Sequence, residues 1–417
     1  MQHALYRAAK ADPGRRFHAL WDKILRRDVL WRAWVMVRRN DGAPGIDGAS
    51  LAEVEEYGVT RLLDELAAEL KEGRYRPLPA RRVFIPKPGS RETRPLSIPS
   101  VRDRIVQAAL KTVLEPVFEA DFLPCSFGFR PRRGAHDALQ VVIDESWRGR
   151  RWVVETDIAN CFEAIPIEKL MQAIEERVCD QSVLKLLRVM LRAGVMEDGT
   201  VRRPVTGTPQ GGVVSPLLAN VYLHRIDRAW DVRQHGELVR YADDALVMCT
   251  SRRQAEAALA RLRELLAELG LEPKEVKTRI VHLEVGGGGV DFLGFHHRLV
   301  RHVPRRGGKP VTYLARWPAD KAMRHARDRL RELTDRSRLR LPVEVVVQEM
   351  NRFLSGWAAY FRYGNSSRHF DEIRMFTRTR LALWIAKRHH RSRGFGWSVV
   401  AYQMSGPLAL IDLVGIV

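Results

Sequence analysis

The sequence predicts a mixed α/β or α+β region followed by a basic, almost wholly helical domain. Short β-branched runs such as WVVETDI alternate with helical patterns in the middle of the chain. From Pro318 onward, helical periodicity dominates over residues 318–337, 342–362 and 367–390. A length of 417 residues with 45% hydrophobic side chains is enough for two or three compact units with buried cores.

The first hundred residues change from helical patterns to strands. Residues 15–39 combine apolar positions at helical spacing with many arginines, which indicates a basic amphipathic helical region. The Gly/Pro/Asp-rich stretch 40–50 predicts a turn cluster, and a second helical pattern follows over residues 62–70. Residues 76–99 contain too many prolines for a helix, so we expect short strands joined by turns.

The middle of the chain alternates helices and strands. Residues 103–114 have helical periodicity, and Pro116 is expected to end that helix. The run 152–158 predicts a buried strand that closes on a carboxylate. In the Gly-rich loop 206–216, Ser215 is expected to cap the next helix.

Two more elements complete this region. Residues 237–249 place apolar residues on both sides of two aspartates, which predicts a hairpin with acids at its turn. The helix predicted over 254–269 ends at Gly270, a residue suited to a helix C-terminus. Residues 290–295, VDFLGF, have the character of a strand.

The charge predicts a polyanionic partner. Lys and Arg total 70 against 50 Asp and Glu, giving a formal net charge of +20. Arginine is well suited to phosphate contacts, although a compositional bias would produce the same excess. Four scattered cysteines without a C-x-x-C pair argue against a disulfide framework or zinc knuckle. No long apolar run is present, so we expect no membrane association and a cytoplasmic location.

Three carboxylates carry the predicted chemistry. Asp157 closes a predicted strand, and Asp243 and Asp244 lie at the predicted hairpin turn. If they converge, they need a counterion, and Mg²⁺ prefers carboxylate and phosphate oxygens. Two such ions, about 3.5 to 4 Å apart, suit nucleotidyl transfer to a 3′-hydroxyl. A pair of aspartates in a turn is often only a solvated turn, but the flanking apolar strands argue against that reading here.

The motifs and their order resemble those of reverse transcriptases. The segments are TDIANCF (156–162), PQGGVVSPLLANVYL (209–223), YADD (241–244) and FLGF (292–295). Four further segments are more specific to one family. They resemble bacterial group II intron-encoded reverse transcriptases with a maturase domain, and they are IPKPGSRETRPLSIP, SFGFRPRRGAHDAL, NDGAPGIDG and GWAAYFRYGNSSRHF. The resemblance spans roughly residues 20 to 390, and it fits the compact type that lacks a C-terminal DNA endonuclease domain.

The resemblance implies an α+β right-hand polymerase fold, with fingers and a palm built on antiparallel sheet, followed by an all-α thumb and maturase domain. It implies four segments: an N-terminal helical extension (1–75), fingers and palm (76–300), thumb and maturase domain (301–392) and a short tail (393–417).

The resemblance also implies roles for individual residues. Asp157, Asp243 and Asp244 match the catalytic metal-binding acids, and the Ile158 carbonyl matches a backbone metal ligand. The positions matching the nucleotide-binding residues, besides Ile158, are Lys87, Arg94, Phe162, Gln210 and Lys277. Phe162 would exclude a 2′-hydroxyl, and Lys277 would act near the pyrophosphate as a general acid. The positions matching the primer grip are Phe292, Leu293, Gly294 and Phe295.

The basic charge of the C-terminal domain points to further candidate RNA contacts. Arg374, Arg378 and Arg380 lie on a predicted helix of the basic domain and are expected to face RNA. His296-His297 and His389-His390 lack the spacing of metal ligands, so they are interpreted as RNA-facing or merely exposed.

The implied activity is RNA-directed DNA synthesis with two Mg²⁺ ions, for which Mn²⁺ can substitute. The implied partners are the group II intron RNA, an RNA template with a DNA or RNA primer, dNTPs and target DNA. The protein would assist splicing of the intron RNA and support retrohoming.

Three alternatives stay open at the level of sequence. The first is an intron-independent relative that serves defence or repair, against which only GWAAYFRYGNSSRHF speaks. The second is a purely RNA-binding splicing factor with a decayed polymerase fold, and the third is an RNA-dependent RNA polymerase. The intact acids oppose the second, and Phe162 and YADD oppose the third.

Overall fold

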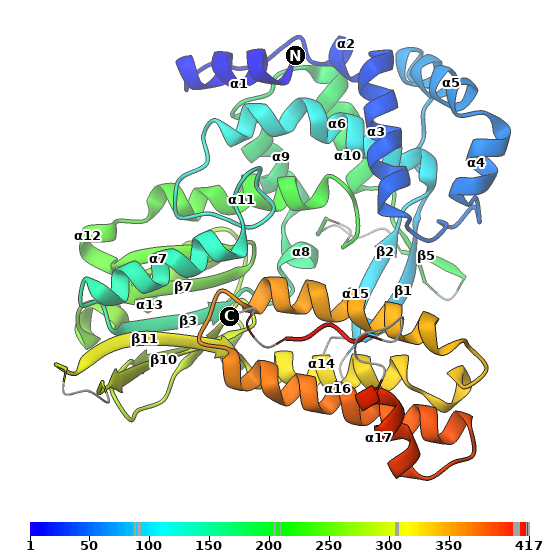
Figure 1. The fold of residues 1–417 in the computed structure, drawn as a ribbon. Coiled ribbons are helices and arrows are strands. Elements are labelled where there is room, and N and C mark those ends of the chain that lie inside the picture. Colours follow the sequence, from blue (N-terminus) through cyan, green and yellow to red (C-terminus); the bar gives the residue numbers. More distant parts are fainter. Residues whose placement is uncertain are drawn as a thin grey trace. The chain divides into compact units, whose positions relative to one another are not determined.

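We describe the fold from a computed structural model of the chain, drawn in Figure 1. It describes residues 1–86, 89, 93–197, 199–202, 206–208, 210–304, 308–402, 409–413 and 415. The chain forms two compact units. The first comprises residues 1–85, 93–145 and 152–280, and the second comprises 86–92, 146–151 and 281–417.

The first unit is built mainly of helices around two small sheets. Its helices are α1 (Gln2–Ala11), α2 (Trp21–Ile24), α3 (Arg27–Asn40), α4 (Leu51–Tyr57), α5 (Val59–Lys71), α6 (Val101–Glu119), α7 (Ala135–Trp147, whose last two residues belong to the second unit), α8 (Cys161–Ala164), α9 (Ile167–Glu175), α10 (Gln181–Leu191), α11 (Ser215–Ala229), α12 (Val232–His235), α13 (Arg252–Glu268) and the 3₁₀ turn η1 (Glu275–Lys277). Its strands are β1 (Ala80–Pro86), β2 (Thr93–Ile98), β3 (Trp152–Asp157), β4 (Val195–Glu197), β5 (Thr200–Arg202), β6 (Glu237–Tyr241), β7 (Asp244–Cys249) and β8 (Arg279–His282), which runs across the unit boundary.

The two sheets contain the predicted strands β1, β2, β3, β6 and β7 together with β4, β5 and β8, which were not predicted. One sheet has the order β2-β1-β4-β5, with β1 and β4 parallel. The other has the order β6-β7-β3-β8, and both β6 and β3 pair antiparallel with β7. Helix α13 packs on β3 and β7 (Figure 1). One hydrophobic core, running in sequence from Leu5 to Leu271, includes side chains of β3, β6 and β7 and of many of the helices in this unit.

Local sequence explains where several helices begin and end. Ser50 and Glu53 form a capping box at the start of α4. Ser251 caps α13, and Gly270 follows its end with φ +72°, as predicted for a glycine at this position. Ser215, in contrast, was wrongly assigned as a cap: Val214 occupies the N-cap position and Ser215 is the buried first residue of α11.

Pro116 does not end its helix, contrary to the sequence prediction. Helix α6 continues through it to Glu119. A proline removes the N–H that would bond the carbonyl four residues earlier, here that of Thr112. The side-chain amide of Gln2 on α1 donates to this carbonyl at 3.1 Å, so a tertiary contact replaces the missing helical bond.

The second unit contains an antiparallel sheet and a group of helices. The strands, in the order β11-β10-β9, are β9 (Val290–Phe292), β10 (Phe295–His302) and β11 (Val311–Pro318). The helices are α14 (Asp320–Leu333), α15 (Val343–Phe361), α16 (Ser367–Arg388), α17 (Arg393–Tyr402) and the 3₁₀ turn η2 (Arg336–Arg338). The sequence analysis predicted the three long helices but not the β10–β11 hairpin, nor α17 in the segment expected to be a short tail.

The second unit has a core of its own. Aromatic and aliphatic side chains of α15 and α16, among them Trp357, Phe361, Phe370 and Trp384, are buried there. Helix α14 packs against both of these helices. Within the described residues, no helix is sufficiently long and apolar to cross a lipid bilayer.

Candidate active site

The three predicted acids lie at adjacent strand ends in the first unit. Ala242 and Asp243 form the two-residue turn between β6 and β7, because Tyr241 pairs with Asp244. Asp244 in turn lies directly opposite Asp157, the last residue of β3. Directly paired residues of an antiparallel sheet point to the same face. The prediction that the hairpin turn and the end of β3 meet at one place therefore agrees with the structure.

The carboxylates influence one another electrostatically. Burial, followed by the charges of Asp243 and Asp157, raises the pKa of Asp244 to about 7. Burial, and then Asp157, also raise the pKa of Asp243. Negative charge is thus concentrated in a partly desolvated place, which favours a cationic partner.

Lys277 supplies one cation at this place. Its ammonium donates to Asp157 Oδ2 at 2.5 Å. Burial opposes the charged amine, but the bond to Asp157 and the other acids outweigh burial and raise the pKa of Lys277. Lys277 is therefore protonated at neutral pH and lies beside Asp157.

The donor set fits a hard divalent cation in kind. It consists of the three carboxylates and the backbone carbonyl of Ile158. The isolated β-bridge that pairs Ile158 with Pro273 does not use this carbonyl as an acceptor. That bridge is made by Ala159 N–H on Glu272 O and Lys274 N–H on Asp157 O. Oxygen donors of these types are those that Mg²⁺ prefers. Among the residues that the structure describes, no three acidic, His or Cys side chains are gathered closely enough to form a finished metal cluster. The acids are neighbours without converging on one point.

Arg240 supports the Ala242–Asp243 turn through hydrogen bonds, and sequence reasoning missed it. Its side chain is only 1% exposed. Its guanidinium donates to five acceptors: Asp227 Oδ1 (2.8 Å) and Oδ2 (2.6 Å), Asn220 Oδ1 (3.1 Å), Ser126 Oγ (2.8 Å) and the carbonyl of Ala242 (3.0 Å). The last bond fixes Ala242, which has φ +58° and precedes Asp243. An arginine inside an otherwise apolar strand was the signal that could have revealed it.

The predicted nucleotide-pocket residues other than Lys87 lie in the first unit. Phe162 is half-buried in α8 against the core, and its carbonyl accepts from Thr208 N–H at 2.6 Å. Arg94 lies exposed on β2, and the carbonyl of Gln210 accepts from Ser97 N–H of the same strand at 2.6 Å. Lys87 lies outside the described residues.

Gly211 explains how the loop of Gln210 approaches β2 so closely. It has φ +109°, and a Cβ atom there would be 2.4 Å from the Ser97 carbonyl oxygen. Only glycine fits this position, because any side chain would collide with the backbone of β2.

The predicted primer-grip residues belong to the second unit and form a tight turn. Leu293 and Gly294 both have positive φ, +50° and +79°, and join Phe292 to its partner Phe295. Both phenylalanines are buried, and the Phe295 ring packs at 4.9 Å on that of Phe361. The parts of this motif open to a ligand are therefore the turn residues Leu293 and Gly294.

The three predicted RNA-binding arginines lie on α16 with different surroundings. Arg374 pairs with Asp371 at 2.9 Å, and Arg380 donates to the hydroxyl and carbonyl of Thr334. Arg378 is half-buried, and no ion pair is found for it within the described residues.

His297 is not an exposed residue, contrary to the sequence interpretation. It is fully buried on β10, and neither ring nitrogen makes a hydrogen bond of good geometry. A contact with the backbone of Phe292 raises the pKa of His297, but it is the smallest of the contributions. Burial, followed by the charge of Arg316, lowers the pKa of His297 to about 3. The strand alternation places His297 inward and His296 outward, where His296 bonds Asp291 at 2.6 Å.

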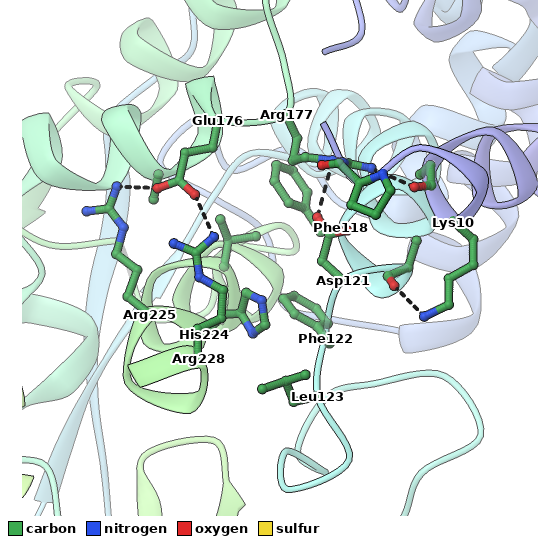
Figure 2. Close-up of a pocket in the computed structure, with 15 residues that line it drawn as sticks. Lys10, Phe118, Asp121, Phe122, Leu123, Glu176, Arg177, His224, Arg225 and Arg228 are labelled. Atoms are coloured by element: carbon green, nitrogen blue, oxygen red, sulfur yellow. Dashed lines mark hydrogen bonds and ion pairs between the residues drawn. The ribbon is translucent and has the colours of Figure 1, made fainter. Parts of the chain in front are cut away.

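A separate pocket of about 430 Å³ lies among α1, α6, α9 and α11 of the first unit (Figure 2). Its charged side chains face one another. Glu176 bonds Arg225 at 2.7 Å and Arg228 at 3.1 Å, and Arg177 pairs with Asp121 at 3.2 Å. None of the three acids lines it. We interpret it as a junction of the N-terminal helix with the core.

An antiparallel sheet with Asp157 at the end of one strand and Asp243 and Asp244 at the adjoining turn and strand start is suited to a nucleotidyl-transferring polymerase. Comparison with protein families identifies the kind. The model "Reverse transcriptase (RNA-dependent DNA polymerase)" matches residues 85–297, and "Group II intron, maturase-specific domain" matches residues 323–402. The chain belongs to the group II intron type of reverse transcriptase, and it is an RNA-directed DNA polymerase with a maturase domain.

Curated relatives agree with this family. Protein YkfC of Escherichia coli is 34% identical over 352 residues, which cover 75% of this chain and 91% of YkfC. The group II intron-encoded protein LtrA of Lactococcus lactis is 37% identical over 214 residues. That match covers 51% of this chain and 35% of LtrA, so the likeness reaches about a third of LtrA.

Proposed function

We propose that the chain extends a DNA or RNA primer along an RNA template from dNTPs, using Asp157, Asp243 and Asp244. The observation that carries this proposal is the pairing of Asp157 with Asp244 beside Asp243 at one strand end. We assign residues 76–300 to fingers and palm, 301–392 to thumb and maturase domain, 1–75 to the N-terminal extension and 393–417 to a tail.

The acids would hold two Mg²⁺ ions, or Mn²⁺, together with the Ile158 carbonyl. When bound, such ions supply Lewis acidity at the attacking 3′-hydroxyl and the departing pyrophosphate. The chain's own residues orient the reactants. The raised pKa of Lys277 keeps its ammonium protonated beside Asp157, where it can give a proton to the leaving group.

The dNTP would contact Phe162, Arg94 and the loop of Gln210. Lys87, which lies outside the described residues, is assigned to the triphosphate from the family resemblance alone. A phenyl ring under the sugar leaves no room for a 2′-hydroxyl, while cations neutralise the triphosphate. The bond of Ser97 N–H to the Gln210 carbonyl supports this grouping, because it ties the strand of Arg94 to the Gly-rich loop.

The second unit would bind group II intron RNA, assist its splicing and support its insertion into target DNA. The maturase-specific family match and the printed name of LtrA support this part. The RNA performs its own transesterification, so the protein needs only a folded basic surface, with Arg374, Arg378 and Arg380 as candidate contacts. The Leu293–Gly294 turn, with Phe292 and Phe295 beneath it, is the candidate primer grip.

The decisive experiment is primer extension on an RNA template by Asp243→Asn. Loss of one oriented carboxylate should slow extension at least about 100-fold, since a lost transition-state interaction of this kind costs about 3 kcal/mol. Asp64→Asn, an exposed charge on α5, is the matched control. Near-normal extension by Asp243→Asn at saturating Mg²⁺ would refute the assignment.

A second variant tests which nucleotide is used. Phe162→Val should open space for a 2′-hydroxyl and raise the rNTP to dNTP ratio of kcat/KM by relieving a clash. An unchanged ratio with normal folding would make Phe162 a core residue and remove the argument for dNTP selection.

A further inference from the structure

The loop Ser126–Arg133 contains two backbone conformations that side chains rarely adopt. Phe129 has φ +57° and Arg132 has φ +59°. Both are exposed, and 51% of Phe129 is accessible to solvent. A left-handed backbone at a bulky residue such as phenylalanine costs of order 1–3 kcal/mol and persists only when the surrounding structure imposes it.

The surrounding structure does impose it. Arg130, whose side chain is 4% exposed, pairs with Glu119 at 2.7 Å and donates to the carbonyls of Leu123 and Ser126. Asn220 of α11 donates to the Gly128 carbonyl at 2.7 Å. These contacts fix the residues on both sides of Phe129, so its ring is held outward.

The same loop lies against the catalytic turn. Phe127 N–H donates to the Arg240 carbonyl at 2.9 Å. A Cβ atom at Gly128 would be 2.5 Å from the backbone nitrogen of Ala242, the residue before Asp243. Phe129 therefore follows directly on a residue in backbone contact with the turn that carries the acids.

In the part of the chain that the structure describes, neither of these exposed side chains has a partner. Within the described residues, the Phe129 ring makes no ring or cation contact, and Arg132 makes no hydrogen bond or ion pair. Arg133, in contrast, lies over the Phe127 ring at 5.1 Å and belongs to the loop's own packing. An outward aromatic ring and a free guanidinium three residues apart suit a ligand with bases or sugars and phosphates.

We propose that Phe129 and Arg132 contact the primer–template duplex beside the catalytic turn. Phe129 packs its ring on a base or sugar near the primer terminus, and Arg132 binds a phosphate. Both residues hold the duplex where Asp243 and Asp244 act. This inference rests on the proposed polymerase function, and it adds a duplex-binding site that the acids do not provide.

The test measures binding of a labelled DNA primer annealed to an RNA template, without dNTPs, across a range of salt. Glycine tolerates positive φ, so Phe129→Gly removes the ring and relieves the backbone strain together. We expect its melting temperature to equal or exceed that of the parent protein, while its Kd for the duplex rises at least about fivefold. Phe129→Tyr keeps an aromatic ring, so its Kd for the duplex should stay close to that of the parent protein.

Arg132→Ala should reduce the slope of log K against log[salt] by somewhat under one unit. Arg253→Ala, an exposed arginine on α13 without an ion pair in the described part of the chain, changes the net charge equally and should leave that slope unchanged.

Three results would overturn the proposal. The first is an unchanged duplex affinity in Phe129→Gly. The second is a lowered melting temperature of that variant, which would show that the ring stabilises the fold by packing. The third is an equal salt slope for Arg132→Ala and Arg253→Ala. The experiment also separates this inference from the proposed function. Because binding is measured without dNTPs, a parent protein that binds the duplex through Phe129 but extends no primer refutes only the polymerase assignment.

Discussion

At the scale of single residues, the buried Arg240–Asp227 pair is the support on which the catalytic turn depends. Burial would raise the pKa of Asp227, but the Arg240 charge and hydrogen bonds outweigh burial and lower it. Removing one partner of a buried pair leaves the other charge without compensation. The pair is therefore a strong constraint in the folded state.

We predict that Arg240→Met lowers the free energy of unfolding by about 3–5 kcal/mol. The double variant Arg240→Met with Asp227→Leu should recover a large part of that loss, because no uncompensated charge remains. Urea titrations of the parent, both single variants and the double variant give the coupling energy. Additive single effects would show that the two side chains do not support each other.

His297 predicts a pH dependence of stability. Its folded-state pKa of about 3 lies below the ordinary value of 6.5, so between these values the unfolded chain binds a proton that the folded chain does not. The stability of the second unit should therefore be intact above pH 6.5 and fall as the pH drops toward 3, by up to about 1.4 kcal/mol per pH unit. Replacing His297 by Phe should flatten this slope in urea titrations between pH 6.5 and 4.5. A slope identical to that of the parent would assign the acid sensitivity to other groups.

The site residues were predictable from sequence to different degrees. The strand-end pattern and the order of the motifs suggested that Asp157 lies near Asp243 and Asp244, and their strand ends do meet. The roles of Arg240 and Phe129 depend on contacts between segments more than a hundred residues apart, such as Arg240 with Ser126. No local pattern encodes these, and the strand alternation around His297 was hidden because the β10–β11 hairpin was not predicted.

At the scale of elements, α6 shows how a tertiary contact overrides a local rule. Proline usually ends or bends a helix, yet α6 passes through Pro116 while Gln2 bonds the Thr112 carbonyl. Gln2 also accepts from Arg32 of α3 at 3.1 Å, so its amide links three helices. Helices α5, α13, α14, α15 and α16 follow the predicted periodicity, whereas α1 and α17 were not predicted.

We predict a measurable coupling between Gln2 and Pro116. Gln2→Ala should lower the free energy of unfolding by about 0.5–1.5 kcal/mol, the usual contribution of a hydrogen bond. In a Pro116→Ala background, the restored N–H satisfies the Thr112 carbonyl, and Gln2→Ala should cost less. A double-mutant cycle by urea unfolding gives the difference, and equal costs in both backgrounds would show that the Gln2 bond does not replace the helical one.

At the scale of the whole molecule, the predicted acids lie in one compact unit and the maturase-specific match lies in the other. We predict that Asp243→Ala with Asp244→Ala abolishes DNA synthesis while intron RNA affinity and splicing stay near normal. Extension and splicing assays on the cognate intron check both parts. A folded double variant that loses splicing as fully as synthesis would show that the two activities share a site.

The arginines of α16 test the reverse case, in which RNA binding is weakened while DNA synthesis is kept. Arg378→Ala should leave extension intact and lower the salt slope of intron RNA binding by somewhat under one unit. Arg380→Ala is the structural contrast: because Arg380 bonds Thr334, we expect it to lower the melting temperature as well.

The strand order β6-β7-β3-β8 also has a consequence for synthesis on the ribosome. β3 is complete at Asp157, but its neighbours β7 and β8 begin only at Asp244 and Arg279. At about 5–20 residues per second, the nascent chain carries the apolar β3 for several seconds with both edges unpaired. An unpaired apolar strand is a template for association with other chains. The yield of folded enzyme should therefore depend on how quickly the segment between β3 and β8 is translated. It should also depend on which chaperones bind the nascent chain during that interval.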